Sequence, residues 1–235
     1  MSNLAKQPKL SILLFFVVLL TCGWSAQLVF YPPTHWLPVD PNKLEKEVLV
    51  QYVSHGSNKI VPSINLAKEN IPNSAEEYLQ AVCAMYDKDA HITYHSLGTI
   101  KTRSGKAHLL ELNLQANKKE LTLLQAILIK DKTAYVLTGA AAVQDFTRYR
   151  PLYITSIRSM QITDDLISIT DPAKQDRLIS KIHLLTDELK KCKAENKTKP
   201  LQQQLEAFYE YLSEEFLEMG DYWRYLLIQE LLKAA

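Results

Sequence analysis

Two histidines, His91 and His95, have a spacing that suits metal binding on a helix. Side chains four residues apart on a helix lie on one face and can reach the same ion. The segment that holds them, HITYH, is predicted to be a strand, where side chains four positions apart stand about 13 Å from one another. We therefore expect the two imidazoles to lie on a partly solvated sheet face, and we predict no metal site.

Other groups of charged residues have ordinary structural explanations. Asp87 and Asp89 could bind calcium, but their segment lacks the glycine and the distal glutamate of an EF-hand loop, so we expect a helix end and a turn. Arg148, Arg150 and Arg158 could bind an anion, but their spacings do not form a single helical stripe. We expect these arginines to be ordinary surface residues.

Local signatures of catalysis are absent from the sequence. The closest two of the 6 glycines, Gly98 and Gly105, are seven positions apart, which excludes the glycine-rich phosphate loops. The motifs G-x-S-x-G, H-E-x-x-H and C-x-x-C are also absent, and Ser54-His55 has no evident catalytic partner. We predict a non-enzymatic protein without a cofactor. An exported hydrolase or metal-dependent enzyme, with a site assembled from distant residues, remains the alternative.

The N-terminus resembles a bacterial export signal. Lys6 and Lys9 precede an eleven-residue apolar block, LSILLFFVVLL, which small residues follow. Three outcomes are open: lipidation at Cys22, cleavage after Ser25, or an uncleaved anchor formed by the uncharged residues 10–31. Each outcome places residues 27–235 outside the cytoplasm. The sequence therefore predicts a protein on the periplasmic side of the cell envelope, attached to the membrane in two of the three cases.

Charge separates the exported chain into two regions. Residues 27–162 hold 15 basic and 12 acidic side chains, a net charge of +3, whereas residues 163–235 hold 10 basic and 14 acidic side chains, a net charge of −4. Neither region is basic enough to predict nucleic-acid binding. We expect three segments: an export signal or anchor at 1–26, an α+β domain at 27–162 and a helical region at 163–235.

The α+β domain is predicted to contain an antiparallel sheet with helices packed on it. Apolar patterns predict strands at 47–53, 59–67, 90–97, 107–115, 120–130 and 133–140. The segment 120–130 is nearly all apolar, so we expect it to lie centrally in the sheet. A capping box, Ser74-x-x-Glu77, begins a helix that runs to about 87, and Asp145 is expected to cap a second helix that Pro151 kinks or breaks. We expect one face of the strand at 120–130 to contact both helices.

Short motifs from Pro33 to Ile162 resemble the PsbP-like, or Mog1/PsbP/DcrB-like, fold family. They are Pro33-x-x-Trp36, Ser63-Ile64-Asn65-Leu66, Ser74-x-Glu76-Glu77-Tyr78-Leu79, Gly105-Lys106-Ala107, Ala134-Tyr135-Val136-Leu137-Thr138-Gly139, Asp145-Phe146-x-x-Tyr149-Arg150-Pro151-Leu152 and Ile157-x-Ser159-Met160. The resemblance implies an α+β domain that is mostly non-enzymatic and acts as an extrinsic subunit of a membrane complex or as a small binding module. It covers a little over half of the chain and excludes the residues after 163.

The residues after 163 are predicted to form a helical hairpin and a short last helix. Asp171-Pro172 begins the first helix, Pro200 the second, and Gly220 ends the second helix before Asp221 caps the third. Cys192 on the first helix could pair with Cys83, or both cysteines could simply be buried.

Four glutamates of the second helix recur every four residues on the side away from its apolar seam: Glu206, Glu210, Glu214 and Glu218. No Lys or Arg lies between Leu201 and Met219, so this stripe carries only like charges. It is either a solvated acidic face or a contact surface for a basic protein partner. The sequence thus predicts a membrane-tethered binding or assembly subunit, or an adaptor that acts through its helical hairpin.

Overall fold

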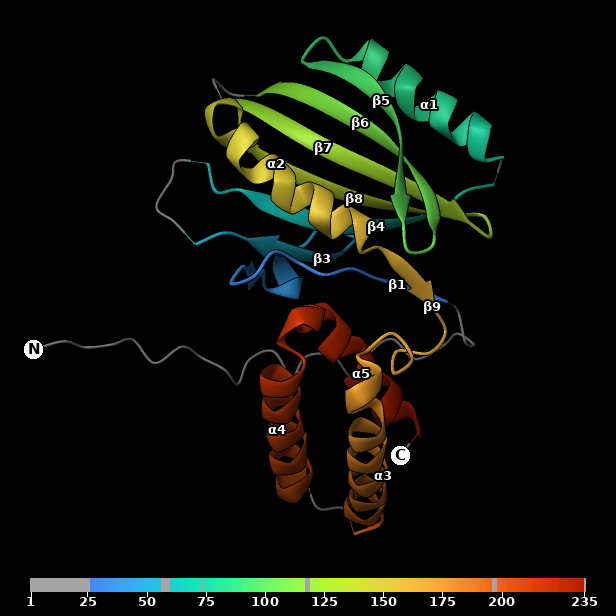
Figure 1. The fold of residues 1–235 in the computed structure, drawn as a ribbon, viewed down its shortest axis with the longest axis vertical. Helices are drawn as coiled ribbons and strands as arrows, with labels where there is room; N and C mark the ends of the chain where they lie inside the picture. Colours follow the sequence, from blue (N-terminus) through green and yellow to red (C-terminus); the bar gives the residue numbers. More distant parts are fainter. Residues whose placement is uncertain (1–25, 56–59, 73, 117–118, 196–197, 235) are drawn as a thin grey trace, which may run out of the picture.

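A seven-stranded antiparallel sheet forms the larger part of the computed structural model, which describes residues 26–55, 60–72, 74–116, 119–195 and 198–234. Its spatial order is β2-β3-β4-β8-β7-β6-β5 (Figure 1). The strands are β2 (Leu37–Pro38), β3 (Val48–Val53), β4 (Ser63–Asn70), β5 (Ile92–Thr102), β6 (Gly105–Ala116), β7 (Lys119–Lys130) and β8 (Thr133–Ala142). The predicted α+β class and the four-strand meander from β5 to β8 are confirmed.

The central strand β7 is apolar on both faces, and each face carries its own helix. Leu124, Ala126 and Leu128 belong to the core cluster that α2 (Val143–Arg158) covers. Ile127, on the opposite face, packs in the cluster of α1 (Ala75–Lys88). The expectation that one face would contact both helices is therefore wrong. Apolar residues on both sides of a strand show that both faces are buried, but they do not assign helices to faces.

Local signals define the ends of several elements. The predicted capping box is present, because Ser74 Oγ accepts from the Glu77 amide at 3.2 Å while the Glu77 carboxylate accepts from the Ser74 amide at 2.9 Å. The turn between β7 and β8 consists of Asp131 and Lys132, with φ of 50° and 58°. Two successive positive φ angles match the twist of a two-residue hairpin turn.

The second helix, α2, differs from the prediction at its start, and of the two effects predicted for Pro151 the break is absent. It begins at Val143 after Ala142, which makes no side-chain cap, so Asp145 is not the capping residue. Pro151 does not break the helix, which continues to Arg158. Tyr153 and Ile157, downstream of the proline, are fully buried against the sheet. Burial of these two side chains offsets the loss of one helical hydrogen bond at Pro151.

A small two-stranded sheet lies between the larger sheet and the C-terminal helices. It pairs β1 (Gln27–Val29) with β9 (Gln161–Thr163), which the sequence did not predict as strands. Side chains of β1 and the next residue alternate between two cores: Leu28 and Phe30 pack in the sheet core, and Val29 packs among the helices. This segment therefore joins the two parts of the molecule.

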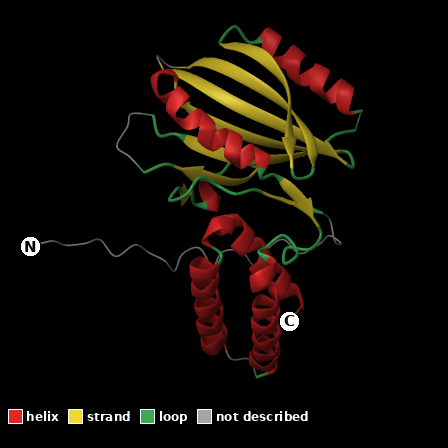
Figure 2. Ribbon diagram, in the orientation of Figure 1, coloured by secondary structure: helices red, strands yellow, loops and turns green. Residues whose placement is uncertain are grey.

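The C-terminal helices lie below the sheet in the view of Figure 1, and Figure 2 shows that this part contains no strand among the described residues. They are α3 (Pro172–Ala194), α4 (Thr198–Glu215) and α5 (Gly220–Ala234), with a 3-10 turn, η2 (Leu217–Met219), before α5. A second 3-10 turn, η1 (Pro41–Lys43), precedes β3. The predicted hairpin of two helices followed by a third is confirmed; we call α3 and α4 the hairpin.

Three boundaries in this region differ from the prediction. The second helix begins at Thr198 and not at Pro200, and it ends at Glu215 and not at Met219. The last helix, 15 residues long, begins at Gly220, so Asp221 lies within its first turn and does not cap it. Gly220 adopts a φ of 74°, and a Cβ there would lie 2.5 Å from Pro32 Cγ. Only glycine fits this conformation beside the proline, which explains why the chain turns at this position.

Candidate functional site

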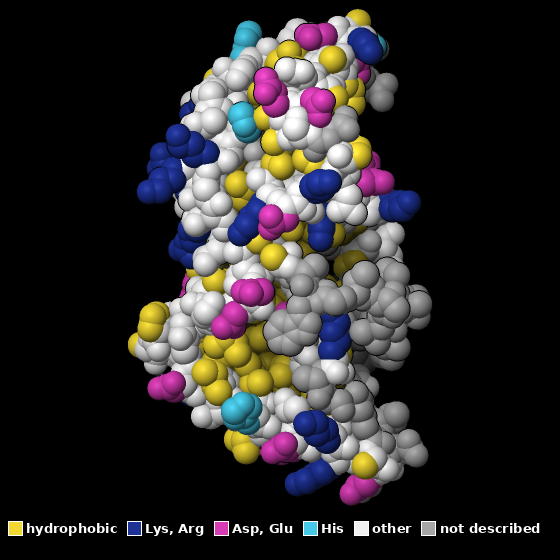
Figure 3. Space-filling model, turned by 90° about the vertical axis from the view of Figure 1, so that its right-hand side faces the viewer, with side chains coloured by type: hydrophobic (Ala, Val, Ile, Leu, Met, Phe, Trp, Pro, Cys, Tyr) yellow, Lys and Arg dark blue, Asp and Glu magenta, His cyan; other side chains and the backbone are white. Residues whose placement is uncertain are grey.

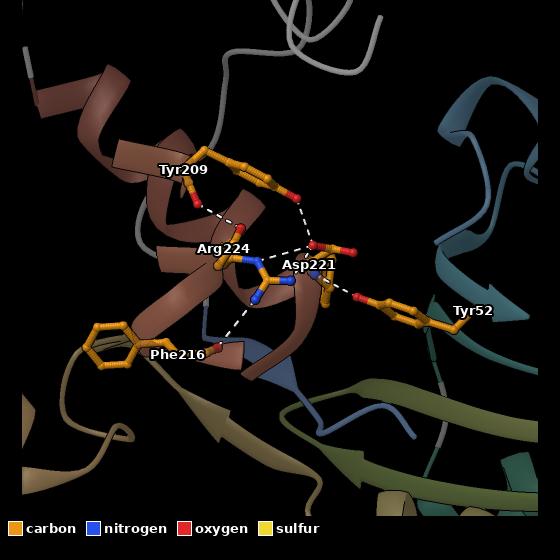
Figure 4. Close-up of polar contacts among 7 residues, drawn as sticks. Tyr52, Tyr209, Phe216, Asp221 and Arg224 are labelled. Carbon is orange, nitrogen blue, oxygen red and sulfur yellow. Dashed lines mark hydrogen bonds and ion pairs between the residues drawn. The ribbon is translucent and has the colours of Figure 1, made fainter. Parts of the chain in front are cut away.

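The junction between the sheet and the C-terminal helices contains a group of buried polar contacts (Figure 4). Tyr52 reaches it from β3, Tyr209 from α4, and Asp221, Tyr222 and Arg224 from the start of α5. The backbone N–H of Tyr222 donates to Tyr52 Oη at 2.7 Å. The first amides of a helix have no partner within the helix, so Tyr52 acts as a remote cap for α5.

The Arg224 guanidinium is only 4% exposed, and protein groups satisfy it. Its Nε donates to Asp221 Oδ1 at 3.1 Å, its Nη2 donates to the same oxygen, and its Nη1 donates to the carbonyl of Phe216 at 3.3 Å. Tyr209 Oη also donates to Asp221 Oδ1, at 2.7 Å. Because a buried charge is costly without partners, this arrangement fixes the end of α4 and the start of α5 relative to each other.

Protonation at the junction is fixed around neutral pH. Burial, followed by the Asp221 carboxylate, raises the pKa of Tyr209 to about 12 and raises the pKa of Tyr52 still further. Burial alone would lower the pKa of Arg224, but Asp221 and Tyr209 outweigh it, and the net shift is upward. These tyrosines stay neutral and the arginine stays charged, so the group holds structure together and is not poised for proton transfer.

The hairpin is held by cations of α3 that contact aromatic and acidic groups of α4 and the ring of Phe216, the residue directly after α4. Arg177 pairs with Glu215 at 3.3 Å and lies over the Tyr211 ring, 5.6 Å from its centroid. Lys181 lies over the same ring at 5.3 Å, and Lys174 lies 5.3 Å from the centroid of Phe216. The basic side of α3 is therefore used within the chain.

The structure places three of the four predicted partner-binding glutamates on α4. Glu206, which accepts from Gln202 Nε2 at 2.9 Å, is half-buried, and Glu210 and Glu214 are exposed. Glu218 lies in η2 beyond the helix end and pairs with Lys174 at 3.8 Å. The helical stripe of four is thus wrong in its last member, because the backbone leaves the helix before that residue.

The remaining candidates from the sequence lie apart. His95 in β5 stands opposite Glu111 of β6, whereas His91 precedes the strand and donates its amide to Asp89 Oδ1 at 2.9 Å. The described residues contain no group of three or more His, Cys, Asp or Glu side chains placed to hold a metal ion. Asp87 accepts a 3.5 Å hydrogen bond from Tyr94 near the end of α1.

Two of the three arginines have partners on the sheet part. Arg150 Nε lies 3.5 Å from the Glu111 carboxylate, and the Arg148 guanidinium lies 5.5 Å from the Tyr149 ring centroid. Arg158 is in the last turn of α2. Ser54 is buried directly after β3, and its amide donates to the Pro62 carbonyl at 2.9 Å.

The two cysteines within the described residues, Cys83 and Cys192, do not pair with each other. Cys83 on α1 and Cys192 on α3 are free and half-buried. Figure 1 shows these two helices at opposite ends of the molecule, so the fold keeps the two residues apart. Cys22, the candidate lipidation residue, lies outside the described residues.

The burial of β1 and the residue after it changes one interpretation of the N-terminus. Leu28, Val29 and Phe30 are buried in the two cores, so residues 27–31 are not available to a membrane anchor. The uncharged run before β1 then covers residues 10–26, which is at the short end of the 17–25 residues that span a bilayer. Within the part of the chain that the structure describes, no helix has the length and apolarity needed to cross a membrane.

The junction is not predicted from the sequence. The sequence pattern predicts only a capping role for Asp221 and no role for Tyr52 or Arg224. One usable signal was present: Arg224 interrupts the apolar run of α5 three residues after an acid. A cation in such a run needs a nearby anion, and Asp221 is within one helical turn.

Three solved structures are similar to this chain. LpqN, described as involved in cell envelope biogenesis of Mycobacterium tuberculosis, is 14% identical, with a TM-score of 0.46 over 59% of this chain and 84% of LpqN. Cyanobacterial PsbP from Synechocystis sp. PCC 6803 is 14% identical, with a TM-score of 0.41 over 62% of this chain and 99% of PsbP. PA94 of Pseudomonas aeruginosa, a protein of unknown function, is 13% identical, with a TM-score of 0.41 over 56% of this chain and 94% of PA94.

These similarities concern the fold alone, and they include a protein with the name of the family that the sequence resembles. No protein-family description and no curated protein matches the chain.

Proposed function

We propose that the chain is an exported, non-catalytic binding or assembly subunit of the cell envelope, attached to the membrane on the periplasmic side by its N-terminal segment. The signal-like residues 1–26 support export. The position of β1 supports it as well, because this first described strand begins at Gln27, after the predicted cleavage positions. Removal or lipidation of the signal would therefore leave Leu28, Val29 and Phe30 in their two cores.

The observation that carries the binding role is that α5 is attached both to the sheet and to the hairpin. The Tyr222 amide donates to Tyr52 Oη of β3 at 2.7 Å, and Tyr209 of α4 donates to Asp221 Oδ1 of α5 at 2.7 Å. A rigid element presents its exposed side chains in a fixed geometry, which reduces the entropy lost when a partner binds.

The exposed side of α4 is the surface that we assign to the partner. The described residues offer no cation within ion-pair distance of Glu210 or Glu214, whereas Glu215 and Glu218 have partners on α3. An acidic face that the described side chains leave without a cation suits a partner with Lys or Arg at the matching positions. We therefore propose that the hairpin docks onto a basic region of another envelope protein.

Affinity purification of the tagged full chain from detergent-solubilised membranes tests this role. The variant carries Glu206→Gln, Glu210→Gln and Glu214→Gln, and its matched control carries the same change at three exposed glutamates of the sheet part, Glu45, Glu76 and Glu120. Three partner contacts of about 0.5 kcal/mol each predict about a tenfold lower recovery, with a larger effect at low salt. Equal recovery with the hairpin variant and the control would contradict docking through α4.

A further inference from the structure

The first described residues, Ala26 and Gln27, are held by hydrogen bonds on the side of the molecule that includes α5. The Ala26 carbonyl accepts from Tyr135 Oη at 3.2 Å, and Gln27 Nε2 donates to Glu230 Oε1 at 3.3 Å. Gln27 also pairs with Thr163 of β9. An attachment of the N-terminal segment would therefore connect to the side of the molecule where β1, β9 and α5 meet.

A membrane tether at the N-terminus would allow only a short distance between the bilayer and Gln27. Cys22 precedes Gln27 by five residues, and an extended chain covers at most about 3.6 Å per residue, or about 18 Å in total. An anchor that ends at Ala26 would leave no linker at all. Under either form of attachment, the surface around Gln27 is the part of the described molecule held near the bilayer.

The helical surface on this side has an apolar area. Figure 3, which faces the right-hand side of Figure 1, shows hydrophobic side chains gathered over the part that contains α3 and α5. Ile179 of α3 is 36% exposed, and Ile182 of α3 and Leu226 of α5 are half-buried at the edge of the helical core.

We propose that the face formed by α3 and α5 rests on the surface of the lipid bilayer, a proposal that relies on the membrane tether of the proposed function. This orientation directs α1 and the far edge of the sheet away from the membrane. The connection from β9 to α3 carries the exposed acids Asp164 and Asp165, so contact should come from apolar side chains and not from attraction to anionic lipids.

Quenching by labelled lipids tests the orientation in the full chain, isolated from membranes and reconstituted in vesicles. Cys83 and Cys192 are replaced by Ser, as is Cys22 if it is not acylated. Single cysteines that carry a fluorophore are placed at Ile179 and, in a second variant, at Gln229 of α5. Matched sites away from the proposed face are Glu210 of α4 and the exposed Met85 of α1. The vesicles contain a lipid with a nitroxide on its headgroup, with and without anionic lipid.

We expect at least twofold stronger quenching at Ile179 and Gln229 than at Glu210 and Met85, with little change when anionic lipid is added. Equal quenching at all four sites, in protein that floats with the vesicles, would overturn the orientation and leave the tether intact. Protein that does not float with the vesicles would overturn the tether, and the orientation with it.

Discussion

The phenolic oxygen of Tyr52 accepts a 2.7 Å hydrogen bond from the backbone N–H of Tyr222, a residue 170 positions later in the chain. Tyr52 belongs to the sheet core, and Tyr222 lies in the first turn of α5. One side chain of the sheet thus satisfies a helix amide that has no partner within its own helix. The stability of the sheet and the position of the C-terminal helices are therefore coupled.

Replacement of Tyr52 by Phe should weaken this coupling. The variant leaves the amide of Tyr222 without its acceptor, and an unsatisfied buried donor costs about 1–3 kcal/mol. Urea unfolding should show that loss of free energy, whereas Tyr94→Phe, which removes an exposed hydroxyl from a 3.5 Å contact, should change stability by less than about 0.5 kcal/mol. Equal stability of Tyr52→Phe and the wild type would contradict the capping role.

The Asp221–Arg224 pair should show strong coupling in a double-mutant cycle. Arg224→Met leaves a half-buried carboxylate with Tyr209 as its remaining partner, and breaking a buried pair costs about 3–5 kcal/mol. Asp221→Asn alone leaves a buried cation. The double variant should lose less than the sum of the single variants, by about 0.5–3 kcal/mol in unfolding free energy. Strict additivity would show that the two residues act independently.

Leu128→Asp should prevent folding of the sheet. Leu128 is 2% exposed in the core under α2, and an unpaired buried charge costs several kcal/mol. The matched control is Leu184→Asp on α3, where the side chain is 65% exposed and the change should be tolerated. Circular dichroism during heating compares the two variants. A cooperative transition for Leu128→Asp at the wild-type temperature would refute the placement of β7.

Glu230 should make the fold less stable at neutral than at acidic pH. Burial, with a further contribution from Asp165, raises the pKa of its carboxyl above 4.5, although Lys233 opposes the shift. The folded chain therefore binds the proton more tightly than the unfolded chain, and the stability from this group is lost as pH rises through the folded pKa.

The variant Glu230→Gln keeps an acceptor for Gln27 and removes the charge. It should be more stable than the wild type at pH 7, and the difference should shrink as the pH falls toward 4.5. Urea unfolding at both pH values measures this. A difference between the two proteins that does not depend on pH would contradict the assignment.

Elements with strong local signals could be predicted from the sequence. The capping box of Ser74 and Glu77, the turn at Asp131-Lys132 and the Asp171-Pro172 start of α3 each depend on residues within one turn of chain. The meander could be predicted because its strands alternate or are continuously apolar.

Features set by distant contacts could not be predicted. The three-residue strands β1 and β9 depend on distant contacts, because Leu28 of β1 packs in the sheet core and Val29 packs among the C-terminal helices. The apolar spacing of α4 continues through Phe216 and Met219, so the sequence predicts a helix that runs past Glu215. In the structure the helix ends at Glu215, before the turn at Gly220 beside Pro32. The polar junction joins β3, α4 and α5. These elements are adjacent in space, but no local sequence pattern predicts that they contact one another.

Cell fractionation combined with mass spectrometry of the mature N-terminus tests the central claim most directly. The account predicts recovery in the membrane fraction on the periplasmic side, either as a chain that begins at an acylated Cys22 or as a chain that retains its N-terminal segment. In the first case, Cys22→Ala should abolish acylation. A soluble cytoplasmic protein that begins at Met1 would contradict export, the tether and the orientation proposed from it.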